Sequence, residues 1–236
     1  MTNKTLAITT MGQAQYAQYG KQFVESAQQH LKVPLIVYSE HLLETKTTQL
    51  ILQEAFVERN THRPKTNFKY DAVRFCYKPY AICQCVDDYV FEEYDRLLWI
   101  DADTHFLRDI TEQWIDENLW DNDALLNYFG RPNYHSETGV LLFNLRHAKL
   151  QEYLTEIQRL YDTDELYMLK EWHDSYIWDS VRQQFEQQGA KFNNIAQGIP
   201  KVPGGHIIQY MFGTHLDHKK GTRRKQQGYS HERHKG

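Results

Sequence analysis

Two carboxylates stand close together near the middle of the chain, Asp101 and Asp103, directly after the apolar run Leu97 to Ile100. A short apolar run bounded by charge is typical of a buried parallel strand. Because strand side chains alternate, both carboxylates are expected to face one side, with Ala102 between them facing the other. Buried carboxylates are costly unless they are paired or bind a metal. We therefore predict a divalent cation carrying a phosphate at this strand end; a pair of helix-capping Asp residues is the alternative.

Two cations precede this acidic pair, Arg74 and Lys78. They are four residues apart within the helix expected over 71–90, so they share one helical face. Such a face could bind the diphosphate of a donor sugar, or it could be an ordinary solvated surface. Pro79 is expected to lie in a first helical turn or to kink the helix.

Further polar candidates lie at the ends of other expected elements. Thr9, Thr10 and Tyr16 lie at or just after the end of the first strand and could contact a base or ribose, although turn chemistry also uses Thr. His173 and Asp174 open a helix expected over 171–185, where they serve either as a cap or as a site.

The elements that would position these residues alternate along the chain. A strand at 6–10, a helix at 13–31 and a strand at 34–39 form a β-α-β opening, which predicts a parallel sheet with a right-handed crossover. Ligands of such sheets bind beyond the carboxyl ends of the strands. The remaining expected elements are strands at 97–100, 123–130, 140–143 and 190–197, and helices within 41–70 and at 71–90, 148–161 and 171–185.

Composition limits the classes of protein. The 236 residues suit one α/β domain, and the net charge of -4 gives no nucleic-acid signature. Aromatic residues make up 14% of the chain, which suits sugar or nucleotide stacking as well as an ordinary core. The three cysteines are too few for a disulfide framework and are not spaced as zinc ligands. With no signal peptide or transmembrane run in the sequence, we expect a cytoplasmic protein.

The C-terminal segment differs from the body in charge. From His218 onward one acid, Glu232, stands against seven cations, which are Lys219, Lys220, Arg223, Arg224, Lys225, Arg233 and Lys235. We expect a single domain over 1–217 and a basic, flexible tail over 218–236. The tail could contact phosphates or an anionic surface peripherally, or it could simply aid solubility.

Taken in order, the motifs resemble those of the GT-A nucleotide-sugar glycosyltransferases, closest to the group that contains glycogenin and bacterial lipopolysaccharide galactosyltransferases. The resemblance rests on RFCYKPYAI at 74–82, YDRLLWIDADTHFLRDI at 94–110, SETGVLLFNL at 136–145 and HDSYIWD at 173–179. It extends over residues 1–220 in architecture. It implies a Rossmann-like, mostly parallel central sheet flanked by helices.

The resemblance also implies a reaction, the transfer of a sugar from a UDP-linked donor to an acceptor hydroxyl of an unidentified glycan, lipid or protein. A Mn²⁺ or Mg²⁺ ion would stabilise the diphosphate leaving group. Asp101 and Asp103 would bind this metal, with Asp101 also near the ribose and Ala102 also among the donor-binding residues. His215 is the predicted third ligand, and His206 and His218 are its rivals.

The same resemblance assigns the remaining site residues. Lys219 or Lys220 would reach the diphosphate. Asp174 matches the Asp of the family's Asp-Gln pair and would be the sugar-binding or catalytic carboxylate, with Ser175 in the Gln position. Glu137 stands where the family has Asn and would bind sugar hydroxyls or satisfy a turn. His173 could contact the same sugar as Asp174. Retention or inversion at the anomeric carbon stays open.

Two other functions remain as alternatives. One is a non-catalytic module that binds a nucleotide sugar. The other is a haloacid-dehalogenase-type phosphatase, whose strand also ends in an Asp-x-Asp pair with a nucleophilic first Asp. Here the pair follows two earlier strands, and Thr104 is one position early for that motif.

Overall fold

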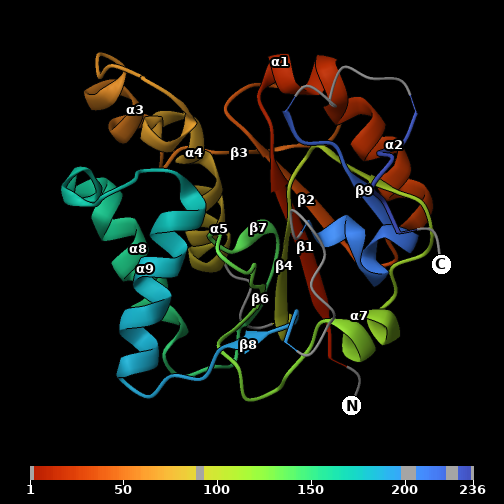
Figure 1. The fold of residues 1–236 in the computed structure, drawn as a ribbon. Helices are drawn as coiled ribbons and strands as arrows, with labels where there is room; N and C mark the ends of the chain where they lie inside the picture. Colours follow the sequence, from red (N-terminus) through yellow and green to blue (C-terminus); the bar gives the residue numbers. More distant parts are fainter. Residues whose placement is uncertain (1–2, 89–92, 198–205, 222–227, 235–236) are drawn as a thin grey trace.

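A seven-stranded sheet forms the centre of the protein in a computed structural model, which describes residues 3–88, 93–197, 206–221 and 228–234 (Figure 1). The strand order is β3-β2-β1-β4-β7-β6-β8. The strands are β1 Thr5–Thr10, β2 Leu35–Ser39, β3 Thr48–Gln49, β4 Arg96–Ile100, β6 Leu126–Phe129, β7 Glu137–Asn144 and β8 Asn193–Asn194.

The sheet is mostly parallel, as predicted. β1 pairs in parallel with both β2 and β4, so the β-α-β opening is confirmed. β7 is antiparallel to both of its neighbours, β4 and β6. β7 also begins at Glu137, three residues before the expected strand, so that Glu137 and Thr138 belong to the sheet.

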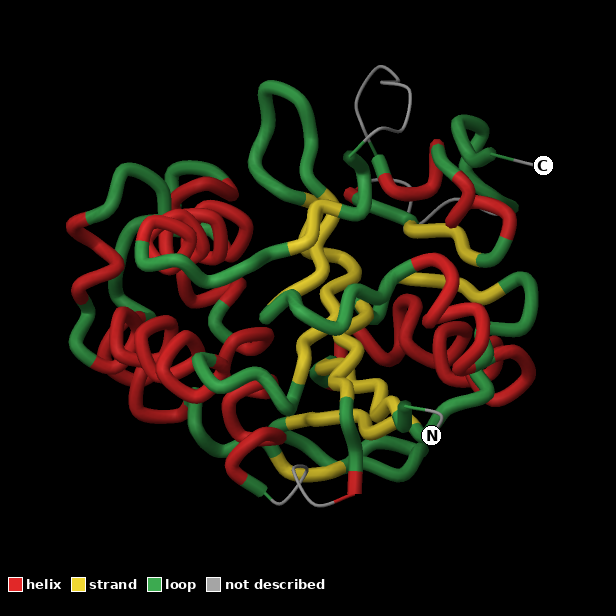
Figure 2. The backbone as a smooth tube through the Cα atoms, turned by 90° about the horizontal axis from the view of Figure 1, so that it is seen from below, coloured by secondary structure: helices red, strands yellow, loops and turns green. Residues whose placement is uncertain are grey.

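Helices cover both faces of the sheet, which runs through the middle of the molecule (Figure 2). In Figure 1, α3, α4, α5, α8 and α9 lie on one side, and α1, α2 and α7 lie on the other. Their bounds are α1 Gln13–Gln15, α2 Lys21–His30, α3 Glu54–Asn60, α4 Ala72–Phe75, α5 Tyr77–Asp87, α7 Glu112–Asn118, α8 Leu150–Asp162 and α9 Asp174–Gln187.

Alternation along β4 divides the core into two parts. Leu97 and Trp99 belong to the cluster under α5, α8 and α9, whereas Leu98 and Ile100 belong to the cluster under α2. Successive side chains of a strand point to opposite faces, and here both faces are covered. This burial on both sides explains the continuous apolar run before Asp101.

Two expected helices are interrupted. The helix predicted over 13–31 contains a π-helical turn at Tyr16–Gly20 between α1 and α2. The helix predicted over 71–90 is divided at Cys76 into α4 and α5, with Pro79 in the first turn of α5, where a missing N–H is tolerated. Residues 89 and 90 of this prediction lie outside the described residues.

A small second sheet joins the middle of the chain to its end. β5 Thr104–Phe106 pairs antiparallel with β9 Leu216–His218. β9 therefore crosses the domain boundary that we expected after residue 217.

The described part of the C-terminal segment packs on the body, which differs from the flexible tail that the sequence predicts. The buried Ser230 donates its amide to Asp217 Oδ2 at 2.9 Å, and the His234 amide donates to the Ile208 carbonyl at 2.7 Å. These backbone hydrogen bonds fix residues 228–234 where composition alone suggests mobility. Arg223, Arg224, Lys225 and Lys235 lie outside the described residues. In the described chain, none of the helices has the length and apolar character needed to span a bilayer.

Candidate functional site

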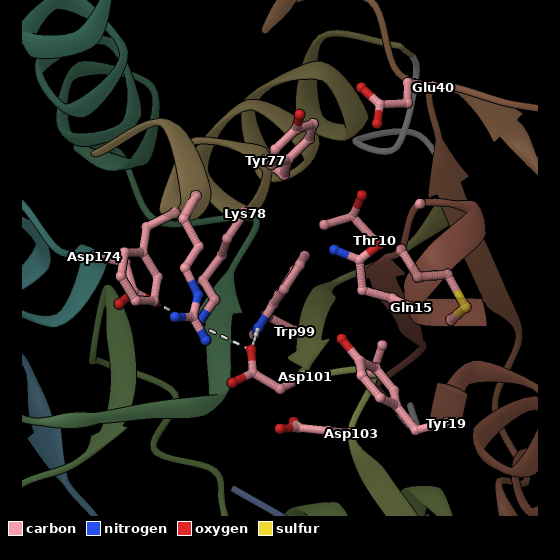
Figure 3. A pocket seen from close by; sticks show the side chains of 15 residues that line it. Thr10, Gln15, Tyr19, Glu40, Tyr77, Lys78, Trp99, Asp101, Asp103 and Asp174 are labelled. Carbon is pink, nitrogen blue, oxygen red and sulfur yellow. Dashed lines mark hydrogen bonds and ion pairs between the residues drawn. The ribbon is translucent and has the colours of Figure 1, made fainter. Parts of the chain in front are cut away.

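A cleft opens at the carboxyl ends of β1, β2 and β4 (Figure 3). This is the edge at which parallel α/β sheets bind ligands. Its lining combines carboxylates, cations and aromatic rings: Thr10, Met11, Gly12, Gln15, Tyr19, Glu40, Arg74, Phe75, Tyr77, Lys78, Trp99, Asp101, Ala102, Asp103 and Asp174.

Asp101 and Asp103 lie in a turn that follows β4. The Thr104 amide donates to the Asp101 carbonyl at 3.1 Å, and the Asp101 amide donates to the Gly139 carbonyl of β7 at 2.8 Å. Trp99 Nε1 donates to Asp101 Oδ1 at 2.8 Å. Both carboxylates approach the same imidazole, as expected from the sequence. The reason differs from the predicted one, because the two residues lie in a turn after β4 and not in the strand itself.

That imidazole belongs to His218. The pairing of β5 with β9 sets Thr104 opposite His218, which brings the ring beside the acidic turn. His218 Nε2 lies 2.9 Å from Asp103 Oδ1 and 3.6 Å from Asp101 Oδ2. The ring has room because position 139 is glycine, where an added Cβ would lie 2.4 Å from His218 Cε1.

These three side chains fit a divalent metal ion. One atom from each lies within 4.8 Å of the others. His218 Nε2 is 2.9 Å from Asp103 Oδ1, but this buried nitrogen makes no aligned hydrogen bond with the described residues. A buried imidazole nitrogen that faces two carboxylates is the donor set expected of a metal site. Two carboxylates and one imidazole suit Mn²⁺, and the carboxylates alone suit Mg²⁺.

The histidine predicted as third ligand, His215, lies elsewhere. Its ring packs on Trp114 with centroids 4.8 Å apart, and its Nδ1 is 2.7 Å from Thr214 Oγ1. Burial lowers the pKa of His215. The other rival, His206, places its Nδ1 3.5 Å from Glu137 Oε2. The histidine beside the two carboxylates is therefore His218 and not His215. In the register of β5 and β9, the last residue of β9, His218, lies opposite Thr104, next to Asp103.

Lys78 is a buried bridge between two carboxylates of the cleft (Figure 3). Its Nζ lies 2.9 Å from Asp101 Oδ1 and 2.6 Å from Asp174 Oδ2, and it donates to the Thr138 carbonyl at 2.8 Å. Burial alone would lower the pKa of Lys78, but the two carboxylates outweigh it and raise the pKa. Lys78 therefore shares one positive charge between Asp101 and Asp174, and the helical face that it shares with Arg74 does not predict this bridge.

Asp174 is held at the start of α9, as the sequence predicts. It also accepts a hydrogen bond from Thr138 Oγ1 at 2.9 Å. Burial alone would raise the pKa of Asp174, but the Lys78 ammonium and the Thr138 hydroxyl hold it below its usual range. Asp174 is thus an ionised carboxylate in a largely buried setting at the wall of the cleft.

Glu137 lies behind His218, away from the cleft lining, and is fully buried. It forms an ion pair with Lys220, and its Oε2 lies 3.6 Å from Arg131 Nη1. Burial would raise the pKa of Glu137, but Lys220 and the neighbouring cations lower it well below the usual range. Glu137 Oε1 lies 3.9 Å from His218 Nδ1, so this carboxylate faces the far side of the same ring.

The other predicted donor contacts divide into two groups. Thr10, Arg74 and Ala102 line the cleft, although Thr10 Oγ1 already donates to the Tyr38 carbonyl at 3.0 Å. Within the described chain, Thr9, Tyr16, His173, Lys219 and Lys220 do not line it. Thr9 is fully buried in the sheet, and His173 Nε2 lies 2.9 Å from Glu171 Oε2.

Several lining residues were missed from the sequence. Glu40 directly follows β2, so the same strand-end reasoning could have found it. Tyr19 lies in the π-helical turn, whose spacing a 3.6-residue period does not predict. Trp99 belongs to the apolar run that is expected to be buried, and it is buried, but its Nε1 also donates to Asp101 in the cleft.

Comparison with known proteins gives structural likeness without sequence likeness. The sequence matches no protein-family model and no curated protein. The fold is similar to that of the glycosyltransferase GlyE of Streptococcus pneumoniae TIGR4, with a TM-score of 0.51 and 15% identity over 90% of this chain. This chain spans about half of GlyE, 48% of its length.

A second similar structure is a galactosyltransferase, LgtC, solved in complex with donor and acceptor sugar analogs. The TM-score is 0.50 and the identity 15%, over 75% of this chain and 70% of that one. At these identities the likeness concerns the fold. The chain therefore has the α/β fold of solved glycosyltransferases, which confirms the predicted GT-A type architecture.

Proposed function

We propose that this protein is a metal-dependent glycosyltransferase that moves a sugar from a nucleotide-sugar donor, UDP-linked, to an acceptor hydroxyl. The observation that carries the proposal is the convergence of Asp101, Asp103 and His218 beside a cleft at the carboxyl end of β4. The fold shared with solved glycosyltransferases, one of them holding donor and acceptor sugar analogs, supports the same reading.

In this proposal Asp101, Asp103 and His218 hold Mn²⁺ or Mg²⁺. When bound, the ion supplies positive charge that stabilises a diphosphate leaving group. Arg74, exposed at the cleft, is placed to add to that charge, and Tyr19 offers a ring for the nucleotide. Lys219 directly follows His218 but does not line the cleft, so a role for it at the diphosphate is proposed from the resemblance alone.

Asp174 is the proposed carboxylate near the sugar. An oxocarbenium-like transition state develops positive charge at the anomeric carbon, and an ionised carboxylate nearby stabilises it. The ion pair with Lys78 keeps Asp174 ionised and fixes its position. Glu137, with its charge held by Lys220, is better suited to orient His218 than to contact sugar hydroxyls.

The experiment is a calorimetric titration of UDP into the protein with Mn²⁺ present and with the metal chelated. We expect binding that requires Mn²⁺ and is lost in Asp101→Asn and in His218→Ala. His215→Ala is the matched control, because this neighbouring ring lies against Trp114, and it is expected to bind as the wild type does. Equal effects of the two histidine substitutions would contradict the ligand assignment.

Activity separates this proposal from its two alternatives. Release of UDP from UDP-glucose or UDP-galactose, accelerated by candidate acceptor sugars, is expected of a transferase. Metal-dependent UDP binding without any turnover would instead indicate a binding module. Hydrolysis of simple phosphate esters with no nucleotide preference would indicate the phosphatase.

A further inference from the structure

A second group of potential metal ligands lies outside the cleft, and it consists of His135, Glu171 and His173. His135 is in the loop between β6 and β7, and the other two directly precede α9. One ligand atom from each lies within 4.8 Å of the others. None of the three lines the cleft described above.

The spacing of these atoms is close to that of a tetrahedral metal site. Glu171 Oε2 lies 2.9 Å from His173 Nε2 and 3.5 Å from His135 Nε2. Ligands about 2.0–2.2 Å from a tetrahedral zinc ion lie roughly 3.4 Å from one another. A metal ion could therefore enter with only small movements of the side chains.

The surroundings orient the ligand atoms, and Glu171 Oε2 and His173 Nε2 share a hydrogen bond that a metal ion would replace. Lys69 occupies the other carboxylate oxygen, Glu171 Oε1, at 2.9 Å, so Oε2 alone faces both imidazoles. His135 Nδ1 lies 3.7 Å from Asp179 Oδ2. A carboxylate behind a histidine is the usual arrangement that fixes a metal-binding ring.

The three side chains are buried to different degrees, as in a metal site that is open to solvent on one side. Glu171 and His173 are buried, whereas the side chain of His135 is 36% exposed and lines a second cleft together with Tyr134 and Asp179. The His173 ring also packs against Phe75, which holds one side of the cluster. An ion could reach the cluster through the exposed ring of His135.

We propose that His135, Glu171 and His173 form a second metal site, for a divalent transition-metal ion of the zinc class, with a fourth position for water. Two imidazoles and one carboxylate are a ligand set that zinc uses in proteins. The ion would join the loop before β7 to the segment before α9, and so would fix the backbone next to Asp174. The proposal of this site does not depend on the proposed transfer reaction.

The test is calorimetric titration of Zn²⁺ into the full chain carrying Asp101→Asn and Asp103→Asn, which removes two of the three ligands proposed in the cleft. We expect the number of Zn²⁺ ions bound per chain to fall by one when His135→Ala is added. The control is His62→Ala, which changes an exposed histidine and is expected to leave this number unchanged. Asp179→Asn is expected to weaken this binding by about 10- to 100-fold. Circular dichroism checks that each variant is folded.

A second measurement keeps the proposal testable if His135→Ala does not fold. X-ray absorption of the Zn²⁺-loaded parent is expected to give a four-coordinate ion with two imidazole nitrogens. Zinc bound by oxygen alone would overturn the proposal, as would unchanged Zn²⁺ stoichiometry in folded His135→Ala. The UDP titrations use none of these ligands, so the two proposals fail separately.

Discussion

Replacing Lys78 by Met removes the cation that lies between Asp101 and Asp174. Met keeps most of the buried alkyl chain, so the lost charge is the main change. The side chains of Lys78 and Asp174 are 9% and 7% exposed, whereas that of Asp101 is 26% exposed. The cost therefore comes mainly from Asp174, which is left buried without its cation. Breaking a buried ion pair in this way costs about 3–5 kcal/mol, and we expect Lys78→Met to lower the free energy of unfolding by about 3 kcal/mol at pH 7.

The pH dependence has a definite sign. The folded pKa of Asp174 is depressed, so its ion pair stabilises the wild type above the unfolded pKa of about 4 and is lost as pH falls through the folded pKa. In Lys78→Met the same carboxyl has no cation, so its pKa rises above the unfolded value and protonation relieves the cost. The difference between wild type and variant should therefore shrink as the pH is lowered from 7 toward 3.

Urea unfolding followed by circular dichroism at several pH values measures this difference. The matched control is Lys191→Met, because Lys191 also bridges two carboxylates, Asp121 at 3.0 Å and Asp123 at 3.4 Å, but at the surface. Solvent screens that pair, so we expect a much smaller change in the control. Equal losses in both variants, or a loss in Lys78→Met that does not vary with pH, would refute the reasoning.

Two further substitutions test the residues behind His218. Gly139→Ala places a methyl group against the His218 ring, so we expect Mn²⁺ affinity, measured by calorimetry, to fall about 10- to 100-fold while the fold is kept; unchanged affinity would mean that this ring is not a ligand. Glu137→Gln leaves Arg131 and Lys220 without their shared anion, and we expect the free energy of unfolding in urea to fall by about 1–3 kcal/mol at pH 7. Because the pKa of Glu137 is lowered in the folded protein, this difference should shrink as the pH falls below the unfolded pKa of Glu137. Wild-type stability in this variant would contradict the assigned ion pairs.

The strand before Asp101 was readable from the sequence because local rules decide it. An apolar run ending in charge marks a strand buried on both faces, and β4 is one, with its carboxylates at the end of the sheet where ligands bind. The place of Asp174 at a helix start was also predicted from the local sequence, whereas its role near the sugar was implied only by the resemblance.

The third histidine was not readable, because a contact far apart in sequence selects it. Only the pairing of Thr104 with His218 decides that His218, and not His215, meets the carboxylates. The bridge made by Lys78 is hidden for a similar reason. Its partners come from the end of β4 and from the start of α9. Because α5 is buried almost all round, its pattern does not single out the side on which Lys78 lies. In the described residues 228–234, the amides of Ser230 and His234 donate to the Asp217 side chain and the Ile208 carbonyl, contacts that composition alone does not predict.

The most direct test is anomalous diffraction from crystals of the protein soaked with Mn²⁺ and UDP. We predict a Mn²⁺ peak bound by Asp101, Asp103 and His218, with the diphosphate on the same ion and the nucleotide in the cleft beside Tyr19. A structure with UDP bound but no metal between Asp101 and Asp103, or with the nucleotide bound away from this cleft, would contradict the account.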